Sequence, residues 1–474
     1  MFSNCSITTK DSAFARNVTI TMKAMVAAVF ISGSPLIADT GVAIEKITTP
    51  AGHTFWYYPM PQASRTALAV SWAQEVPLND AVHPGVARLG IDVMLNGGAG
   101  SRDASDIVAD YEDLDAGSGL WVQPRHVSGF IFAPNEHFSK AREIANQVMT
   151  APRMGQRWFD REQQRLIGET QEANSGSWGM AWNLAREVIL GEHPYNKFWS
   201  MSPLGEFEKL SLDDINQWFE SSFSTKTATV TIAGSAAADV VARELDLLFA
   251  DMPSGELSDP IKLPLVAASG KTIVLHSPDA PKSVVVLLGS VPDYNEETDL
   301  PLQLGVGVLG FGKQSRLFKA VRAGLGASYG FGASVFDFTR EHRMLQMSGE
   351  IETAQLQEAL KEIEQAYEKF KQAGIGRIEF PIAKRIFKRE YSERLQNPVD
   401  VAFLLSESVL NGYTETFVPN LMDEIDNLNR KTTNEVVSSA LPAYDDLLKV
   451  IVSPDNKAVD GACVISKIEE ARGC

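Results

Sequence analysis

The histidines are the first residues to consider for metal chemistry, because imidazole is the commonest metal ligand in proteins. The chain has 474 residues, and seven of them are histidine. These are His53, His83, His126, His137, His193, His276 and His342. No two lie four residues apart, and none lies in a carboxylate-rich helix with the spacing of metal ligands. The sequence therefore predicts no metal site in this chain.

Two other segments partly match the letters of known motifs but lack the features that those motifs need. Gly305 to Gly310 reads G-x-G-x-x-G, but a dinucleotide site needs a preceding strand and an acid about 20 residues further on. This segment is expected inside a helix, and Arg322 follows in place of the acid. Ser101 lacks the closing glycine of the nucleophile elbow of serine hydrolases. We therefore expect neither a dinucleotide site nor a serine hydrolase.

Composition indicates an ordinary soluble globular protein of two to four domains, with 44% hydrophobic and 22% charged residues. The net charge of -17 argues against nucleic-acid binding, which needs clustered Lys and Arg.

Residues 1–43 are expected to be an export region. Lys10, Arg16 and Lys23 form a basic segment before the apolar run Ala24–Ile31, which is too short to cross a membrane. Met22 would give a tidier start, and a disordered tail is the alternative. An export signal predicts a periplasmic or secreted protein. In that compartment Cys463 and Cys474 could form a disulfide or remain two thiols.

The second half of the chain repeats the pattern of the first at a spacing of about 215 residues. Arg88–Met94 recurs at Gln303–Leu309, and Ser101–Arg102 recurs at Ser315–Arg316. A Pro-, Gly- and Ser-containing linker separates the two copies. The predicted organisation is an export region at 1–43, a first half at 44–252, a linker at 253–263 and a second half at 264–474.

Each half is predicted to form a mostly antiparallel sheet with helices packed on one face, which is an α+β fold. Strands are expected at Thr54–Tyr58, Ala67–Ala73, Gly129–Ala133, Thr227–Ala233, Lys271–His276, Ser283–Ser290, Ser328–Phe336 and Met344–Ile351. The apolar residues of Thr353–Gln372 recur at helical spacing, so this segment is predicted to be an amphipathic helix.

The sequence resembles the insulinase/pitrilysin family of zinc peptidases, whose non-peptidase members include the core subunits of respiratory complex III. Matching segments include Pro84–Gly85, His193–Tyr195, Pro203–Gly205 and Thr229–Gly234. In that family a helix carries H-x-x-E-H, with two zinc-binding histidines and a glutamate base. The resemblance covers about residues 45–450, nearly all of the chain after the export region.

At the two histidine positions this chain has Leu89 and Val93, and at the base position it has Asp92. Leucine and valine have no lone pair to offer a metal. The family's third zinc ligand is a glutamate on a later helix, and Glu169, which lies 76 residues after Val93, corresponds to it. A catalytic zinc needs three protein ligands and an open position, so Glu169 is expected to be a structural remnant.

The resemblance is sharpest at Ser315–Phe318 and Gly324–Tyr329. In the family an arginine and a tyrosine seven residues apart reach from the second half to the zinc site. There they bind the substrate backbone and the developing oxyanion. Arg322 and Tyr329 have that spacing, and the resemblance assigns them this role.

The resemblance therefore implies a non-catalytic subunit with a clamshell chamber for unfolded peptide. A homologous partner would bring H-x-x-E-H and the zinc, while this chain would bring Arg322 and Tyr329 and no cofactor. The alternatives are a peptidase-like scaffold and a peptide-binding protein with no part in proteolysis.

Overall fold

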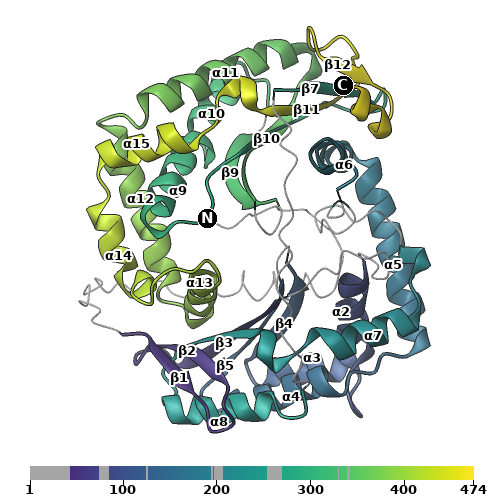
Figure 1. Cartoon of the computed structure of the whole chain (residues 1–474), viewed down its shortest axis with the longest axis vertical. Helices are drawn as coiled ribbons and strands as arrows, with labels where there is room; N and C mark the ends of the chain where they lie inside the picture. Colours follow the sequence, from purple (N-terminus) through teal and green to yellow (C-terminus); the bar gives the residue numbers. More distant parts are fainter. Residues whose placement is uncertain are drawn as a thin grey trace.

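The computed structural model describes residues 43–73, 85–123, 126–193, 196, 207–252, 270–328, 330–338 and 342–474. Two six-stranded sheets with flanking helices confirm the predicted α+β fold in two halves (Figure 1). Residues 1–42 of the predicted export region and the whole linker at 253–263 lie outside the described residues. None of the helices in the described ranges is long and apolar enough to cross a membrane.

The first sheet has the strand order β1-β2-β6-β3-β5-β4. Its strands are β1 Glu45–Thr48, β2 Thr54–Pro59, β3 Arg65–Ala73, β4 Gly117–Val122, β5 His126–Pro134 and β6 Ala228–Gly234. Only β2 and β6 pair in parallel. The helices of this half are α2 Val86–Gly97, α3 Ala104–Asp113, α4 Phe138–Thr150, α5 Gln156–Ser175, α7 Leu212–Ser222 and α8 Ala238–Leu248. Leu68, Val70 and Trp72 share one core with residues of α2, α4 and α8.

The second sheet has the order β12-β7-β11-β8-β10-β9. Its strands are β7 Thr272–His276, β8 Ser283–Ser290, β9 Phe331–Asp337, β10 Arg343–Ile351, β11 Leu448–Ser453 and β12 Cys463–Ile465. It is antiparallel except that β7 pairs in parallel with β11 and β12. Its helices are α9 Glu296–Gly310, α10 Arg316–Phe318, α11 Leu356–Ala373, α12 Glu379–Arg394, α14 Phe417–Asn427 and α15 Arg430–Ala440. The segment Gly305–Gly310 lies inside α9, as expected.

The eight predicted strands and the predicted helix at 353–372 all correspond to observed elements, with ends that shift by a few residues. Four strands were not predicted: β1, β4, β11 and β12. The sequence of the edge strand β4 begins Gly117-Ser118-Gly119, which has little strand propensity. A Cβ at Gly117 or Gly119 would lie 2.6 or 2.7 Å from the rings of Phe132 and Phe130. The glycines therefore let the aromatic rings of β5 pack against the edge strand.

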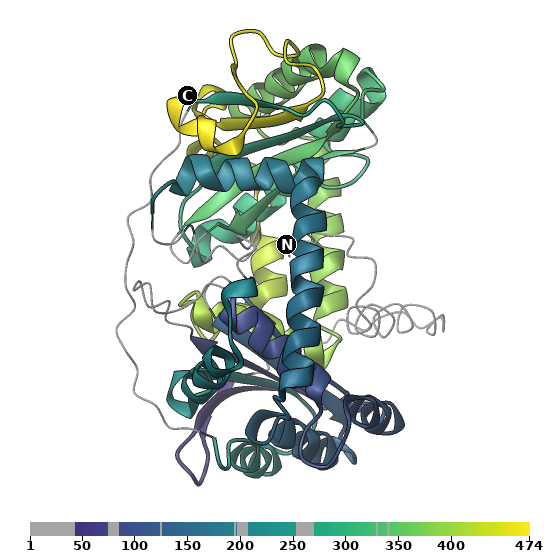
Figure 2. The same ribbon diagram turned by 90° about the vertical axis from the view of Figure 1, so that its right-hand side faces the viewer.

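The prediction that helices pack on one face of each sheet is only partly right. Each half also contributes one helix that packs on the sheet of the other half (Figure 1). Helix α6 (Ser177–Leu190) belongs to the first half, yet Ala181, Leu184 and Ala185 share a core with β7, β8 and β11. Figure 2 shows α5 running from the first half towards the second, where α6 crosses its sheet.

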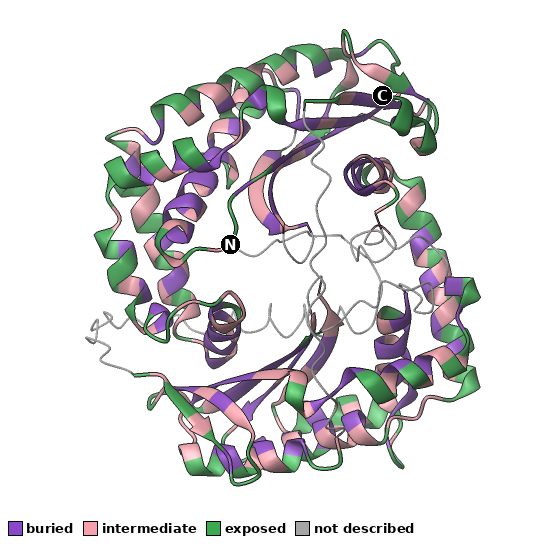
Figure 3. Cartoon of the chain, viewed as in Figure 1, coloured by how far each residue is buried: buried purple, intermediate pink, exposed green. Residues whose placement is uncertain are grey.

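Helix α13 (Pro398–Leu410) makes the reciprocal contact, lying on β3 and β6 of the first sheet. Thr231 Oγ1 on β6 donates a hydrogen bond to the carbonyl oxygen of Ala402 at 2.7 Å. Figure 3 colours α6 and α13 largely as buried or intermediate. Each sheet thus has its second face covered by a helix from the other half.

The C-terminal segment packs on α6 and helps to hold it in place. Of the two states expected for Cys463 and Cys474, a disulfide or two free thiols, the structure has the disulfide. The 3-10 helix η7 (Ile468–Gly473) packs on α6. Arg472 on η7 lies 2.7 Å from Glu187 and 3.0 Å from Glu192.

A buried ion pair holds the turn after α13 to the second half. Arg343 on β10 and Asp299 on α9 are 5% and 2% exposed and lie 2.9 Å apart. Tyr413, which follows α13, donates a hydrogen bond to Asp299. The ring of Tyr294 lies 3.9 Å from the Arg343 guanidinium. This cluster fixes the end of the exchanged helix.

We expect Arg343→Met to lower the free energy of unfolding by about 3–5 kcal/mol, because it leaves the Asp299 carboxylate buried without its cation. The matched control is Arg243→Met, since Arg243 pairs with Asp239 where both side chains are more than half exposed. That variant should change stability by less than about 1 kcal/mol. Urea unfolding followed by circular dichroism measures both, and equal losses would contradict the anchoring role.

Candidate functional site

Helix α2 carries Leu89, Asp92 and Val93, the positions that the sequence resemblance assigns to two zinc ligands and the base. Leu89 and Val93 are fully buried in the core of the first half. Gly90 lets α2 approach α7, because a Cβ there would lie 2.3 Å from the Trp218 ring. The helix therefore packs as an ordinary apolar element at both positions, and these side chains cannot hold a metal.

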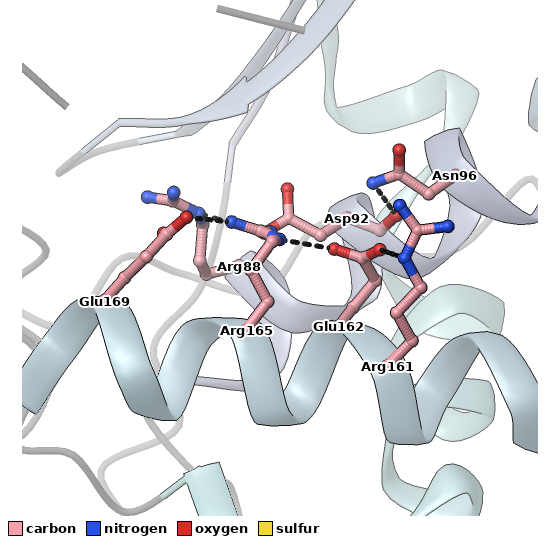
Figure 4. Close-up of polar contacts among 7 residues, drawn as sticks. All are labelled: Arg88, Asp92, Asn96, Arg161, Glu162, Arg165 and Glu169. Atoms are coloured by element: carbon pink, nitrogen blue, oxygen red, sulfur yellow. Dashed lines mark hydrogen bonds and ion pairs between the residues drawn. The ribbon is translucent and has the colours of Figure 1, made fainter. Parts of the chain in front are cut away.

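The polar side of the same site is built around Arg165 on α5 (Figure 4). Its guanidinium lies 2.6 Å from Asp92 on α2, 2.6 Å from Glu162 and 2.6 Å from Glu169. Glu162 and Glu169 flank Arg165 at helical spacings of three and four residues, so all three share one side of α5. Asp92 is 73 residues away in sequence and meets them through the packing of α2 on α5.

Two further arginines complete the charge balance. Arg88 lies 3.3 Å from Asp92, and Arg161 lies 3.5 Å from Glu162. Asn96 donates to the carbonyl oxygen of Asp92 at 2.9 Å. Three carboxylates thus face three guanidinium groups, which we call the Arg165 network. The network has no net charge, although Glu162 is only 1% exposed.

The electrostatics of Arg165 favour its charged form. Burial alone would lower the pKa of Arg165, but Asp92, Glu162 and Glu169 outweigh it and hold that pKa above its ordinary value. The guanidinium is therefore a permanent cation, which lies where the carboxylates Asp92 and Glu169 converge. The Asp92 carboxylate is itself held in ion pairs with two arginines, Arg88 and Arg165.

The structure brings four of the predicted site residues together: Leu89, Asp92 and Val93 on α2 with Glu169 on α5. They do not fit zinc. A catalytic zinc site needs three protein ligands, and of the three positions Leu89, Val93 and Glu169 only Glu169 has a side chain that can bind zinc. Among the described residues no group of three or more His, Cys, Asp and Glu side chains is arranged to hold a metal ion.

Arg322 lies in the second half, in the π-helical segment η4 (Lys319–Gly324). Its side chain is exposed, and Nη1 donates to the carbonyl oxygen of Ser328 at 3.3 Å. Tyr329 lies outside the described residues. A fixed, exposed guanidinium on this segment is the kind of group that binds peptide carbonyls or carboxylates.

An aromatic patch on the first sheet was not predicted from the sequence. Trp121 on β4, Phe130 on β5 and Phe403 on α13 are half-buried, and their ring centroids lie 5.6–5.9 Å apart. Half-exposed aromatic rings beside an edge strand suit contact with apolar peptide side chains. Two other tryptophans lie elsewhere: Trp182 is in the core beside the second sheet, and Trp178 donates a hydrogen bond to Glu350 at 2.8 Å.

Sequence reasoning also missed Arg165 and Glu162. The spacing Glu162, Arg165, Glu169 is a visible signal of helical ion pairs. The partner Asp92 could have been inferred only by placing α2 against α5. Trp121 belongs to the first half and Phe403 to the second. They meet only because α13 packs on the first sheet, which the sequence did not indicate.

Comparison with known proteins identifies the fold of this arrangement and a family model that matches part of the chain. Residues 209–387 match the family model described as the Peptidase M16 inactive domain. No curated protein sequence matches the chain.

The whole fold is similar to solved structures of this class. A peptidase M16 inactive domain from Pseudomonas fluorescens has a TM-score of 0.74 at 17% identity, covering 87% of this chain and 98% of that one. A protease from Helicobacter pylori has a TM-score of 0.75 at 17% identity, covering 87% and 100%. The ferredoxin protease FusC, in complex with Arabidopsis ferredoxin, has a TM-score of 0.70 at 14% identity, covering 90% of this chain and 46% of that one.

We expect Arg165→Met to lower the free energy of unfolding at pH 7 by about 2 kcal/mol or more, because three converging carboxylates lose their shared cation. Thermal unfolding at pH 7 measures it. Arg157→Met, on the exposed side of the same helix, is the control and should have little effect. An equal loss in Arg157→Met would contradict the charge argument.

Restoring the family ligands should restore zinc only if the guanidinium is removed too. A variant with Leu89→His, Asp92→Glu and Val93→His keeps Arg165 on Glu169 and should bind no zinc. Adding Arg165→Ala should allow about one zinc per chain, since two histidines and Glu169 then form a three-ligand site. Metal analysis after dialysis distinguishes the two variants. Equal zinc contents would show that Arg165 does not block the site.

Proposed function

We propose that this chain is a member of the insulinase (M16) family that lacks the H-x-x-E-H motif, and that it is the non-catalytic subunit of a two-chain zinc peptidase. A homologous partner supplies H-x-x-E-H, the zinc and the glutamate base. This chain supplies Arg322 and Tyr329, which bind the peptide backbone and stabilise the oxyanion of the partner's reaction.

The observation that carries the proposal is the Arg165 network. It preserves the α2–α5 framework and the Glu169 carboxylate of a zinc site while a permanent cation takes over the charge balance. A chain with this framework and no metal of its own could take part in peptide hydrolysis only if a partner subunit supplied the zinc. The exposed guanidinium of Arg322 is the complementary feature, a cation in a chain of net charge -17.

We propose an unfolded peptide or protein as the substrate. The similar protein FusC is a ferredoxin protease, which makes a polypeptide substrate the natural first choice. The patch of Trp121, Phe130 and Phe403 supports contact with apolar side chains. We also propose a periplasmic or secreted location, which the Cys463–Cys474 disulfide supports because disulfides persist in oxidising compartments.

The second candidate is a peptide-binding or scaffold protein with no part in proteolysis. The aromatic patch favours peptide binding and would serve either function. The two candidates differ at Arg322, because a scaffold has no use for an oxyanion-stabilising cation.

A reconstitution separates them. The experiment combines this chain with an H-x-x-E-H homologue from the same genome and measures hydrolysis of a quenched fluorescent peptide. We expect each chain to be inactive alone and the mixture to be active. Arg322→Ala or Tyr329→Phe in this chain should lower kcat by about 10²-fold, as for loss of an oxyanion donor. Lys319→Ala, at an exposed position of the same segment, should leave kcat unchanged.

Full activity of the homologue alone would contradict the proposal. So would an active mixture that tolerates both Arg322→Ala and Tyr329→Phe, which would leave the scaffold function in its place.

A further inference from the structure

The disulfide between Cys463 and Cys474 closes a short loop over α6, the helix that the first half contributes to the second sheet. We call residues 463–474 the Cys474 loop. It begins with strand β12, which pairs in parallel with β7, and it includes η7, which packs on α6. Both cysteines pack against the core that α6 shares with this sheet. The loop therefore joins a helix of the first half to the sheet of the second half.

The noncovalent contacts of the Cys474 loop are weak. Strand β12 has three residues, and η7 is a 3-10 helix of six, a length at which that helix is uncommon. The loop buries two side chains, those of Ile465 and Ala471. The Arg472 side chain is 55% exposed, so its ion pairs with Glu187 and Glu192 contribute little to stability. The disulfide is therefore the main restraint that keeps η7 on α6.

The position of the disulfide lets a reductant reach it. Cys463 and Cys474 are half-buried, and their neighbours Val464 and Gly473 are exposed. A thiolate of a dithiol reductant attacks one sulfur, the S–S bond breaks and a mixed disulfide forms. The second thiol of the reductant then displaces this cysteine and closes a disulfide within the reductant. Two electrons and two protons thus pass from the dithiol to the protein, which keeps two thiols.

We propose that the Cys474 loop is a redox-sensitive switch that sets how stably α6 packs on the second sheet. With the disulfide formed, η7 covers α6 around Glu187. After reduction by a dithiol, the loop leaves α6, and this part of the helix opens locally without separation of the halves. The cysteines are 11 residues apart, and loop-closure entropy for a ring of that size corresponds to about a 10²-fold change in the opening of the loop. The switch does not depend on the function proposed above.

Hydrogen exchange of the intact chain, followed peptide by peptide with mass spectrometry, tests the switch with and without dithiothreitol. We expect reduction to accelerate exchange about 10²-fold in η7 and at least about tenfold in α6. Helix α13 is the internal control. It is the reciprocal helix on the first sheet, and the Asp299–Arg343 ion pair rather than a disulfide fixes the turn after it. Its exchange should not change, and alkylation of the new thiols verifies the reduction.

Two variants separate the disulfide from the contacts around it. Cys463→Ser combined with Cys474→Ser should exchange like the reduced wild type and should not respond to dithiothreitol. Arg472→Met keeps the disulfide and loses both ion pairs, so exchange in α6 should rise less than about fivefold. Replacing dithiothreitol with oxidised glutathione should restore the slow exchange of the wild type, as a switch requires.

Any of four results would overturn the switch. The disulfide of the folded chain could resist dithiothreitol, so that no new thiols are alkylated. Reduction could leave exchange in α6 unchanged, or oxidised glutathione could fail to restore it. Finally, α6 and α13 could accelerate equally, which would make the disulfide a restraint on global unfolding rather than on α6. The proposal stands if reduction accelerates exchange in α6 and not in α13, and if oxidation reverses the change.

Discussion

Each sheet of this protein has two apolar faces, and its own helices cover only one. The exchange of α6 and α13 resolves this constraint, because each helix leaves its own half and covers the exposed face of the other sheet. The rest of the structure depends on that exchange. It explains why the disulfide-closed C-terminal segment packs on α6 and why a buried Asp299–Arg343 pair fixes the turn after α13. Separating the halves would expose both faces at once, so they form one cooperative unit.

The Arg165 network solves an electrostatic problem at the contact between α2 and α5. Leu89 and Val93 are fully buried in an apolar core and carry no charge. The neighbouring carboxylates Asp92, Glu162 and Glu169 converge, and converging negative charges repel one another unless a cation lies between them. A guanidinium has the donor geometry to bind several carboxylates at once, which an ammonium lacks. Arg165 thereby makes the zinc-free helix pair stable without a cofactor.

Local patterns in the sequence were sufficient for most of the duplicated fold, while the family resemblance supplied the positions Leu89, Asp92, Val93 and Glu169. Alternating and helical periodicity, repeated about 215 residues apart, reports which face of each element is buried. The exchange of α6 and α13 was not predictable in this way, because a helix that packs on a distant sheet has the same periodicity as one that packs on its own. The glycine-containing strand β4 and the contact between Arg165 and Asp92 were missed for related reasons. Both depend on which elements become neighbours.

The aromatic patch links the exchange to the proposed function. Trp121 and Phe130 come from the edge of the first sheet, and Phe403 comes from the second half on the exchanged helix α13. Their contact exists only while α13 lies on the foreign sheet. A peptide held there would touch both halves of the chain, so its binding would stabilise the exchanged arrangement by mass action. On the proposed function, this dependence would give a subunit without metal a reason to retain the complete two-half architecture.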